Sequence, residues 1–120
     1  MIELKALHHL SFTVADLDAS LGFWRDLLGF NTIDRPDLGF PGAWLQGFGV
    51  EVHLLAPADA KAAEGQLSPL RNHVAFHVDD LAAVRRKLES AGLEVLGGGS
   101  RRQMWILDPS ANVIEFIQPD

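Results

Sequence analysis

The chain has 120 residues, a formal net charge of −6 at pH 7 and a pI near 5.2. This acidic balance argues against nucleic acid or an anionic membrane as the main partner. The lack of cysteine excludes disulfide bonds, thiolate metal ligands and a cysteine nucleophile. The first residues lack the features of a signal peptide, and no apolar run approaches the ~20 residues of a membrane helix. We therefore expect a cytoplasmic protein without a membrane partner.

One stretch of the sequence occurs twice. Residues 9–17, HLSFTVADL, return in register at residues 73–81 as HVAFHVDDL. A repeat of fixed period indicates a duplicated structural unit. In each copy apolar and polar residues alternate, which is typical of a strand with one packed face. An aspartate then stands where a helix N-cap is expected, so each copy predicts a strand that runs into a helix.

The first half predicts the order strand, helix, strand, strand, strand. Residues 7–14 form the first strand, and the helix after it ends at Gly29. Residues 30–35 form a second strand, and residues 43–46 and 50–55 form a hairpin. The helix has an apolar stripe that is expected to cover one face of the first strand. The stripe consists of Leu17, Leu21, Trp24 and Leu28, and the strand face of Leu10, Phe12 and Val14.

The second half repeats this order. Its strands are expected at residues 73–78, 93–96, 104–107 and 113–118. Its helix begins after Asp80 and ends at Gly92, as the helix of the first half ends at Gly29. The apolar stripe of this helix consists of Leu81, Val84, Leu88 and Ala91. We therefore expect one α+β domain made of two βαβββ modules, residues 5–57 and 71–119, joined by a linker over residues 58–70.

The duplication makes equivalent positions visible. His9 and His73 lie near the starts of the first strands, on the face turned away from the helix, and His53 and Glu115 occupy matching places in the last strands. Three of the five histidines thus occupy such positions. Imidazole and carboxylate groups suit a divalent metal such as Zn, Ni, Fe, Co or Mn. A histidine on an open strand face is otherwise an ordinary half-exposed residue, and at this point both interpretations remain open.

These motifs resemble the vicinal oxygen chelate superfamily, which includes glyoxalase I, fosfomycin-resistance proteins, methylmalonyl-CoA epimerase, extradiol dioxygenases and bleomycin-resistance proteins. The resemblance runs from about Leu7 to Gln118 and rests on residues 9–17, 20–30, 73–76 and 108–115. It implies that the modules form a curved mixed sheet around a metal and substrate site. It also implies a homodimer whose sites are shared between chains. Carried over residue by residue, the metal ligands are His9, His53, His73 and Glu115.

The sequence departs from individual family members. Bacterial glyoxalase I has a glutamate where His53 stands, so Glu115 is left as the one candidate base in the ligand set. Fosfomycin-resistance proteins use tyrosine, of which this chain has none. Extradiol dioxygenases are usually longer. The same scaffold carries isomerisation, epimerisation, ring cleavage, thiol addition and plain binding, so the resemblance alone leaves the reaction open.

The resemblance favours a metal-dependent lyase or isomerase of the glyoxalase I type, acting on a small substrate that chelates the metal through vicinal oxygens. Glu115 is the expected catalytic base. Substrate-binding candidates are Trp44 and Trp105 as apolar walls, Arg35 or Arg101 for an anionic group, and His77 on the strand face of His73. For the tryptophans a place in the core or at a dimer interface is the alternative. Other open functions are a metal-dependent dioxygenase, a fosfomycin-type thiol transferase and a non-catalytic, antibiotic-binding protein.

Overall fold

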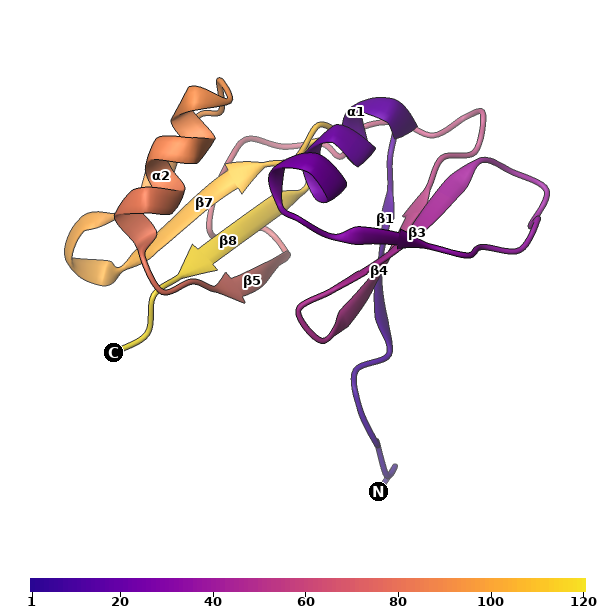
Figure 1. Ribbon diagram of the computed structural model, residues 1–120, viewed down its shortest axis with the longest axis horizontal. Coiled ribbons are helices and arrows are strands. Elements are labelled where there is room, and N and C mark those ends of the chain that lie inside the picture. Colours follow the sequence, from indigo (N-terminus) through magenta and orange to yellow (C-terminus); the bar gives the residue numbers. More distant parts are fainter. The chain divides into compact units, whose positions relative to one another are not determined.

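The structure, a computed structural model, describes the backbone of residues 1–120 and the surroundings of every side chain except at residue 99. The chain divides into two compact units, Met1–Ala62 and Ala63–Asp120, called unit 1 and unit 2 below. Figure 1 shows one helix and one sheet in each. Both units have the predicted order β-α-β-β-β. Residues 58–70 contain no helix or strand.

Unit 1 contains a four-stranded mixed sheet. Its elements are β1 (His9–Thr13), α1 (Leu17–Leu21), the π-helix η1 (Gly22–Leu27), β2 (Asn31–Ile33), β3 (Gly42–Gly47) and β4 (Val50–Leu55). The strand order is β1-β4-β3-β2. Strand β1 pairs with β4 in parallel, and the other pairs are antiparallel.

Unit 2 has the same topology. Its elements are β5 (His73–His77), α2 (Leu81–Ser90), β6 (Leu96–Gly97), the 3-10 helix η2 (Gly99–Arg101), β7 (Gln103–Leu107) and β8 (Val113–Ile117). The strand order is β5-β8-β7-β6, again with one parallel pair, β5 with β8. The predicted fold class, two tandem βαβββ modules with mixed sheets, is therefore confirmed.

The repeat also holds in the strand register. Ser11 lies opposite His53 in unit 1, and Ala75 lies opposite Glu115 in unit 2. His9 and His73 each stand two residues before these partners on the same strand. Because successive side chains alternate between the faces of a strand, each histidine shares a face with the residue on the neighbouring strand. The positions that the sequence made equivalent are thus equivalent in the backbone.

The two helices begin alike and differ in length. Asp16 and Asp80 cap them, each accepting a hydrogen bond of 3.0 Å from the backbone N–H three residues on. Gly29 and Gly92 follow the helices with φ of +87° and +82°, a conformation that glycine adopts without steric cost. The path from cap to glycine is one residue longer in unit 1 than in unit 2. The π-helix, which has wider turns, accommodates the additional residue of unit 1.

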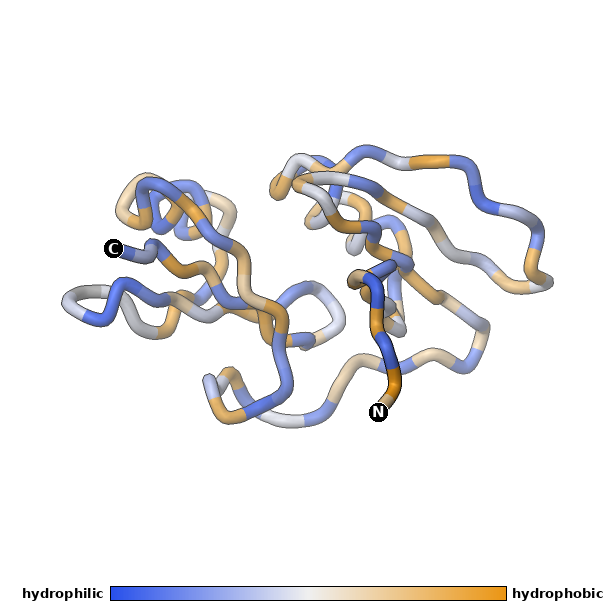
Figure 2. The backbone as a smooth tube through the Cα atoms, turned by 90° about the horizontal axis from the view of Figure 1, so that it is seen from below, coloured by the Kyte–Doolittle hydropathy of each residue, from blue (hydrophilic) through white to orange (hydrophobic). Residues whose placement is uncertain are grey.

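In each unit, one face of the sheet is buried against the helix of that unit. In unit 1 Phe12 stacks on the fully buried Trp24 with 5.2 Å between ring centroids, which confirms the predicted packing of the stripe on this face. In unit 2 the helix residues Leu81 and Leu88 are buried, as are strand residues Met104, Ile106, Ile114 and Phe116. Hydrophobic segments are short and interrupted by hydrophilic ones along the chain (Figure 2). Among the described helices none is long and apolar enough to cross a membrane.

Some predicted boundaries were wrong. The strand expected at residues 93–96 pairs with β7 only through Leu96 and Gly97. Gly97 has a φ of +90°, and a Cβ there would lie 2.7 Å from the Trp105 ring, so a larger residue would not fit at this place without a shift of its neighbours. The second strand is shorter than residues 30–35. Ala91, expected in the apolar stripe, is exposed because it is the C-cap of α2 rather than part of its buried face.

Candidate functional site

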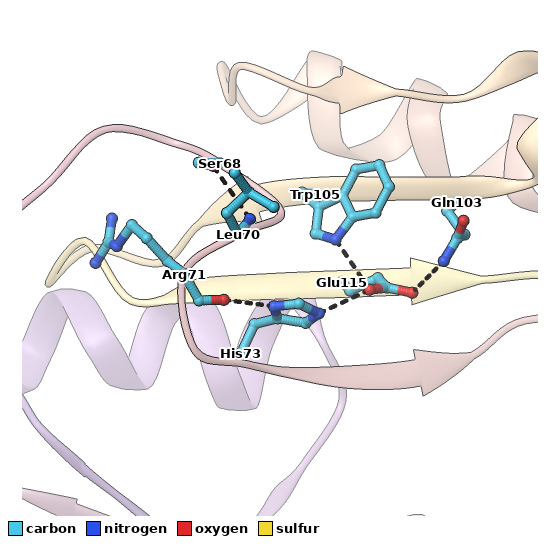
Figure 3. Close-up of polar contacts among 7 residues, drawn as sticks. All are labelled: Ser68, Leu70, Arg71, His73, Gln103, Trp105 and Glu115. Atoms are coloured by element: carbon cyan, nitrogen blue, oxygen red, sulfur yellow. Dashed lines mark hydrogen bonds and ion pairs between the residues drawn. The ribbon is translucent and has the colours of Figure 1, made fainter.

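Glu115, on strand β8 of unit 2, makes three polar contacts. Its Oε1 atom lies 2.9 Å from His73 Nε2 and accepts a hydrogen bond of 2.9 Å from the Trp105 indole. Its Oε2 atom accepts a hydrogen bond of 3.1 Å from the Gln103 amide. Figure 3 shows these three side chains converging on the carboxylate from β5 and β7. The residue is only 5% exposed, so its orientation is set by the protein.

The neighbours of His73 determine which of its nitrogens faces Glu115. Nδ1 lies 2.7 Å from the backbone carbonyl of Arg71, and because a carbonyl only accepts, Nδ1 carries a proton. Nε2, which lies beside the carboxylate, is therefore the ring nitrogen left to bind a metal ion. Two ligand atoms at about 2.1 Å from one ion and at right angles to each other are about 3 Å apart. The spacing of 2.9 Å between Nε2 and Oε1 fits a pair of ligands to one metal ion.

In unit 1 the equivalent position holds His53, which makes ring contacts on both sides. His9 stacks on it with centroids 4.0 Å apart and planes at 12°, and Trp44 with centroids 4.3 Å apart and planes at 7°. The lone pairs of stacked rings lie in nearly parallel planes, so one ring has to turn before His9 and His53 can bind one ion. The donor types suit a divalent metal, but their present orientation differs from that of the pair in unit 2.

Two further side chains contact the histidines of unit 1. His53 Nε2 donates to Glu51 Oε1 at 2.9 Å, and this hydrogen bond lowers the pKa of the Glu51 carboxyl from its ordinary value. The Nδ1 atoms of His8 and His9 lie 2.8 Å apart, so one ring donates to the other. Glu51 and His8 thus hold the histidines of unit 1 in their stacked arrangement.

The two tryptophans are also equivalent. Trp44 lies opposite His53, and Trp105 lies opposite Glu115. Each unit therefore presents the same set across three neighbouring strands, a histidine, a metal-competent middle residue and a tryptophan. Both tryptophans were predicted as apolar walls, but their equivalence was missed, although their separation along the chain is close to the period of the repeat.

The remaining predicted residues lie in different surroundings. Arg35 is half-buried in unit 1, where it donates to the Phe40 carbonyl. His77 is exposed on β5, 3.6 Å from Asp79. Arg101 is exposed at the end of η2. Their roles in substrate binding stay predictions.

Sequence reasoning missed Glu51, Gln103 and the carbonyl of Arg71. Glu51 precedes His53, and Gln103 precedes Trp105, by two positions on the same strand, so their place on the same face was the available signal.

Among the described residues, no group of three or more His, Cys, Asp or Glu side chains is arranged to hold a metal ion. The four candidate ligands instead form two pairs, His9 with His53 and His73 with Glu115, one pair in each unit. Their union in one four-ligand site stays a prediction.

The sequence matches the Glyoxalase/Bleomycin resistance protein/Dioxygenase superfamily over residues 6–116. It is 34% identical to Glyoxylase I 4 of Arabidopsis thaliana over 99% of this chain and 74% of that protein. It is 29% identical to the ethylmalonyl-CoA/methylmalonyl-CoA epimerase of Cereibacter sphaeroides over 78% of this chain and 75% of that one. The structure resembles that of a putative glyoxalase family protein from Bacillus anthracis, with a TM-score of 0.80, 20% identity and coverage of 100% and 99%, which shows the common fold.

The chain therefore belongs to the glyoxalase, bleomycin-resistance and dioxygenase superfamily. This family includes enzymes as well as proteins that bind a small molecule without converting it. Some members of the family use divalent metals.

Proposed function

We propose that this protein is a metal-dependent lyase or isomerase of the glyoxalase type, acting on a small substrate that offers two vicinal oxygens. The observation that carries the proposal is the pair of His73 Nε2 and Glu115 Oε1, 2.9 Å apart on adjacent strands. The equivalent register of His9 and His53 supports two further ligands. Similarity to Glyoxylase I 4 and to an epimerase favours chemistry at neighbouring carbons.

The bound metal would act as a Lewis acid on the vicinal oxygens of the substrate. His73 and Glu115 would hold it, with His9 and His53 completing the ligand set. Glu115 is the group suited to move a proton between adjacent carbons of the substrate, since it is the one carboxylate in the ligand set. Trp105 donates a hydrogen bond to its Oε1 atom and Gln103 to its Oε2 atom, and both bonds keep the carboxylate oriented. We further propose, from the family resemblance, that the active form is a homodimer whose sites draw on both chains.

Metal content tests the proposal directly. Purified wild type should contain a divalent transition metal in near-stoichiometric amount by mass spectrometry of the elements, and a chelator should remove it. His73→Ala and Glu115→Ala should lose the metal. Glu94→Ala removes an exposed carboxylate elsewhere in unit 2 and serves as the matched control. A wild type that binds no metal from a zinc, nickel, cobalt, manganese or ferrous solution would contradict the proposal.

Turnover separates the enzyme from a binding protein. Metal-loaded wild type should convert at least one of the hemithioacetal of methylglyoxal and glutathione, fosfomycin with a thiol, or a catechol, and metal-free protein should convert none. Isomerisation of the hemithioacetal supports the leading proposal, whereas the other two products identify a thiol transferase or a dioxygenase. Binding without turnover in the metal-loaded protein assigns it to the non-catalytic members of the family.

A further inference from the structure

In each unit, two N–H groups that can donate hydrogen bonds lie on or near the strand next to His53 or Glu115. In unit 2 these donors are Trp105 and Gln103, which bind the two oxygens of Glu115 at 2.9 and 3.1 Å (Figure 3). A carboxylate is thus held between an indole N–H and a side-chain amide. Unit 1 shows what becomes of this arrangement when the carboxylate is replaced by an imidazole.

The equivalent of Gln103 in unit 1 is Gly42. Gln103 lies opposite Ile117, the last residue of β8, and Gly42 lies opposite Leu55, the last residue of β4. Gly42 has no side chain, and the guanidinium of Arg35 occupies the space instead. A Cβ at Gly42 would lie 2.5 Å from the Leu54 carbonyl oxygen, 2.9 Å from Arg35 Nη2 and 3.0 Å from Arg35 Cζ. Unit 1 therefore also has an indole and a second donor, and here the second donor is positively charged.

In unit 1, one N–H group of each of these two side chains lacks an acceptor. Among the described residues, Trp44 Nε1 and Arg35 Nε are buried without a hydrogen-bond partner. His53 presents its ring face to Trp44 and gives its own Nε2 to Glu51, so it cannot serve as the acceptor that Glu115 provides in unit 2. A buried donor without an acceptor is unfavourable, and native proteins nearly always provide one.

Arg35 also lacks a counter-charge. No carboxylate of the described residues forms a salt bridge with it, although the chain carries a net charge of −6. Its guanidinium is nonetheless held in place, because Nη2 donates to the Phe40 carbonyl at 3.1 Å and the group lies 5.0 Å from the Phe40 ring centroid. An oriented, half-buried guanidinium is a binding group for carboxylates.

We propose that Arg35 and the indole N–H of Trp44 bind a carboxylate of the substrate, as Gln103 and Trp105 bind that of Glu115. The substrate is then a small acid that carries this carboxylate in addition to the vicinal oxygens, such as a 2-hydroxy dicarboxylic acid. The second part of the statement rests on the proposed function, because the metal is what binds the vicinal oxygens. The carboxylate site itself depends only on residues of unit 1.

Titration calorimetry with matched pairs of acids tests this proposal. Racemic malate is compared with lactate, and racemic 2-hydroxyglutarate with 2-hydroxybutyrate; each pair differs by one carboxylate. For zinc-loaded wild type, at least one dicarboxylate should bind about tenfold more tightly than its matched acid, the effect of one charge-assisted hydrogen bond. No preference for either dicarboxylate would overturn the proposal.

Three variants locate the preference. Arg35→Met keeps most of the length of the side chain and removes the guanidinium, and Trp44→Phe keeps an aromatic ring on His53 and removes the N–H. Both should lose most of the preference while their zinc content and their affinity for lactate stay near wild type. Arg86→Gln removes one positive charge from an exposed helix position in unit 2 and should keep the preference. A preference that survives in both Arg35→Met and Trp44→Phe would overturn the proposal.

The same titrations in chelator-treated protein distinguish this proposal from the metal mechanism. Without metal, lactate and malate each offer a carboxylate to Arg35 and Trp44, so binding of both acids that is lost in Arg35→Met supports the carboxylate site even if the protein holds no metal. A protein that binds metal and lactate without any preference contradicts the carboxylate site and leaves the metal mechanism standing.

Discussion

Units 1 and 2 place their candidate residues on the same strands in the same register, yet the side chains interact differently. In unit 2 the middle residue is Glu115, and its carboxylate gathers hydrogen bonds from neighbouring nitrogens. In unit 1 it is His53, whose flat ring gathers His9 and Trp44 by stacking. One exchange of residue type thus alters how all its neighbours are used. The same backbone thus supports two arrangements. Unit 2 has a carboxylate that accepts hydrogen bonds, and unit 1 has two buried N–H groups, of Trp44 and Arg35, without an acceptor among the described residues.

The largest expected difference between the units concerns loss of a ligand. In unit 1, Glu51 lies beside His53 and His8 lies beside His9, so each can replace its neighbour as a metal ligand. We therefore expect His53→Ala to weaken zinc binding by about tenfold. Loss of a residue that hydrogen-bonds a metal ligand weakens metal binding roughly 10- to 100-fold, and Glu115→Ala should weaken it by more than that. Competition with a chromophoric chelator measures both constants. Equal losses in the two variants would show that the neighbours in unit 1 do not compensate.

A smaller effect is expected from the residues that orient Glu115. Trp105→Phe and Gln103→Leu each remove one donor, at 2.9 and 3.1 Å from the carboxylate, and leave the ligands in place. Each should weaken zinc binding by about tenfold, which is the smallest effect expected when a hydrogen-bond partner of a metal ligand is lost. Gln66→Leu makes the same chemical change at an exposed position in the linker and should have no effect. Unchanged affinity in both site variants would mean that packing alone orients Glu115.

The helices provide a third comparison, through stability. Gly22 has helical dihedral angles, and a Cβ there meets no atom within 4 Å, so Gly22→Ala should raise the free energy of unfolding by about 0.4–1 kcal/mol. Gly92 follows α2 with a φ of +82°, so Gly92→Ala should lower it by about 1–2 kcal/mol. Urea unfolding followed by circular dichroism measures both. A destabilised Gly22→Ala protein would indicate that the π-helix requires glycine.

The smallest effect concerns acid pH and is found in unit 1, whose Glu51 pairs with a histidine. The hydrogen bond from His53 lowers the pKa of Glu51 below its ordinary value of 4.5. The stability that this ionised carboxylate contributes is therefore complete above pH 4.5 and is lost as the pH falls through the lower pKa of the folded state. In chelator-treated protein, the melting temperatures of wild type and Glu51→Gln should differ at neutral pH and converge in acid. Parallel curves, like those expected for the exposed control Glu94→Gln, would contradict this.

The order of elements could be predicted because alternation, caps and stop glycines recur in both halves. The equivalence of His9 with His73 and of His53 with Glu115 followed from the same repeat. The structure brings His9 to His53 in unit 1 and His73 to Glu115 in unit 2. The metal itself stays a prediction.

The contacts of Glu51 and Gln103 could not be predicted, because they depend on which way a side chain leans across neighbouring strands. The close approach of Gly97 in β6 to Trp105 is a contact between two strands, which no local pattern records. The sequence also did not show that Arg35 is half-buried while Arg101 is exposed, because this difference depends on the packing of the Arg35 guanidinium against Gly42.

The π-helix η1 has a consequence for how the two halves could diverge after duplication. A difference of one residue between the halves falls within this helix, where a wider turn accommodates it. Had it fallen within a strand, every following side chain would have moved to the opposite face of the sheet. The helix thus tolerates a change in length that the strands do not, and the loops between the strands accommodate the other differences in length between the halves.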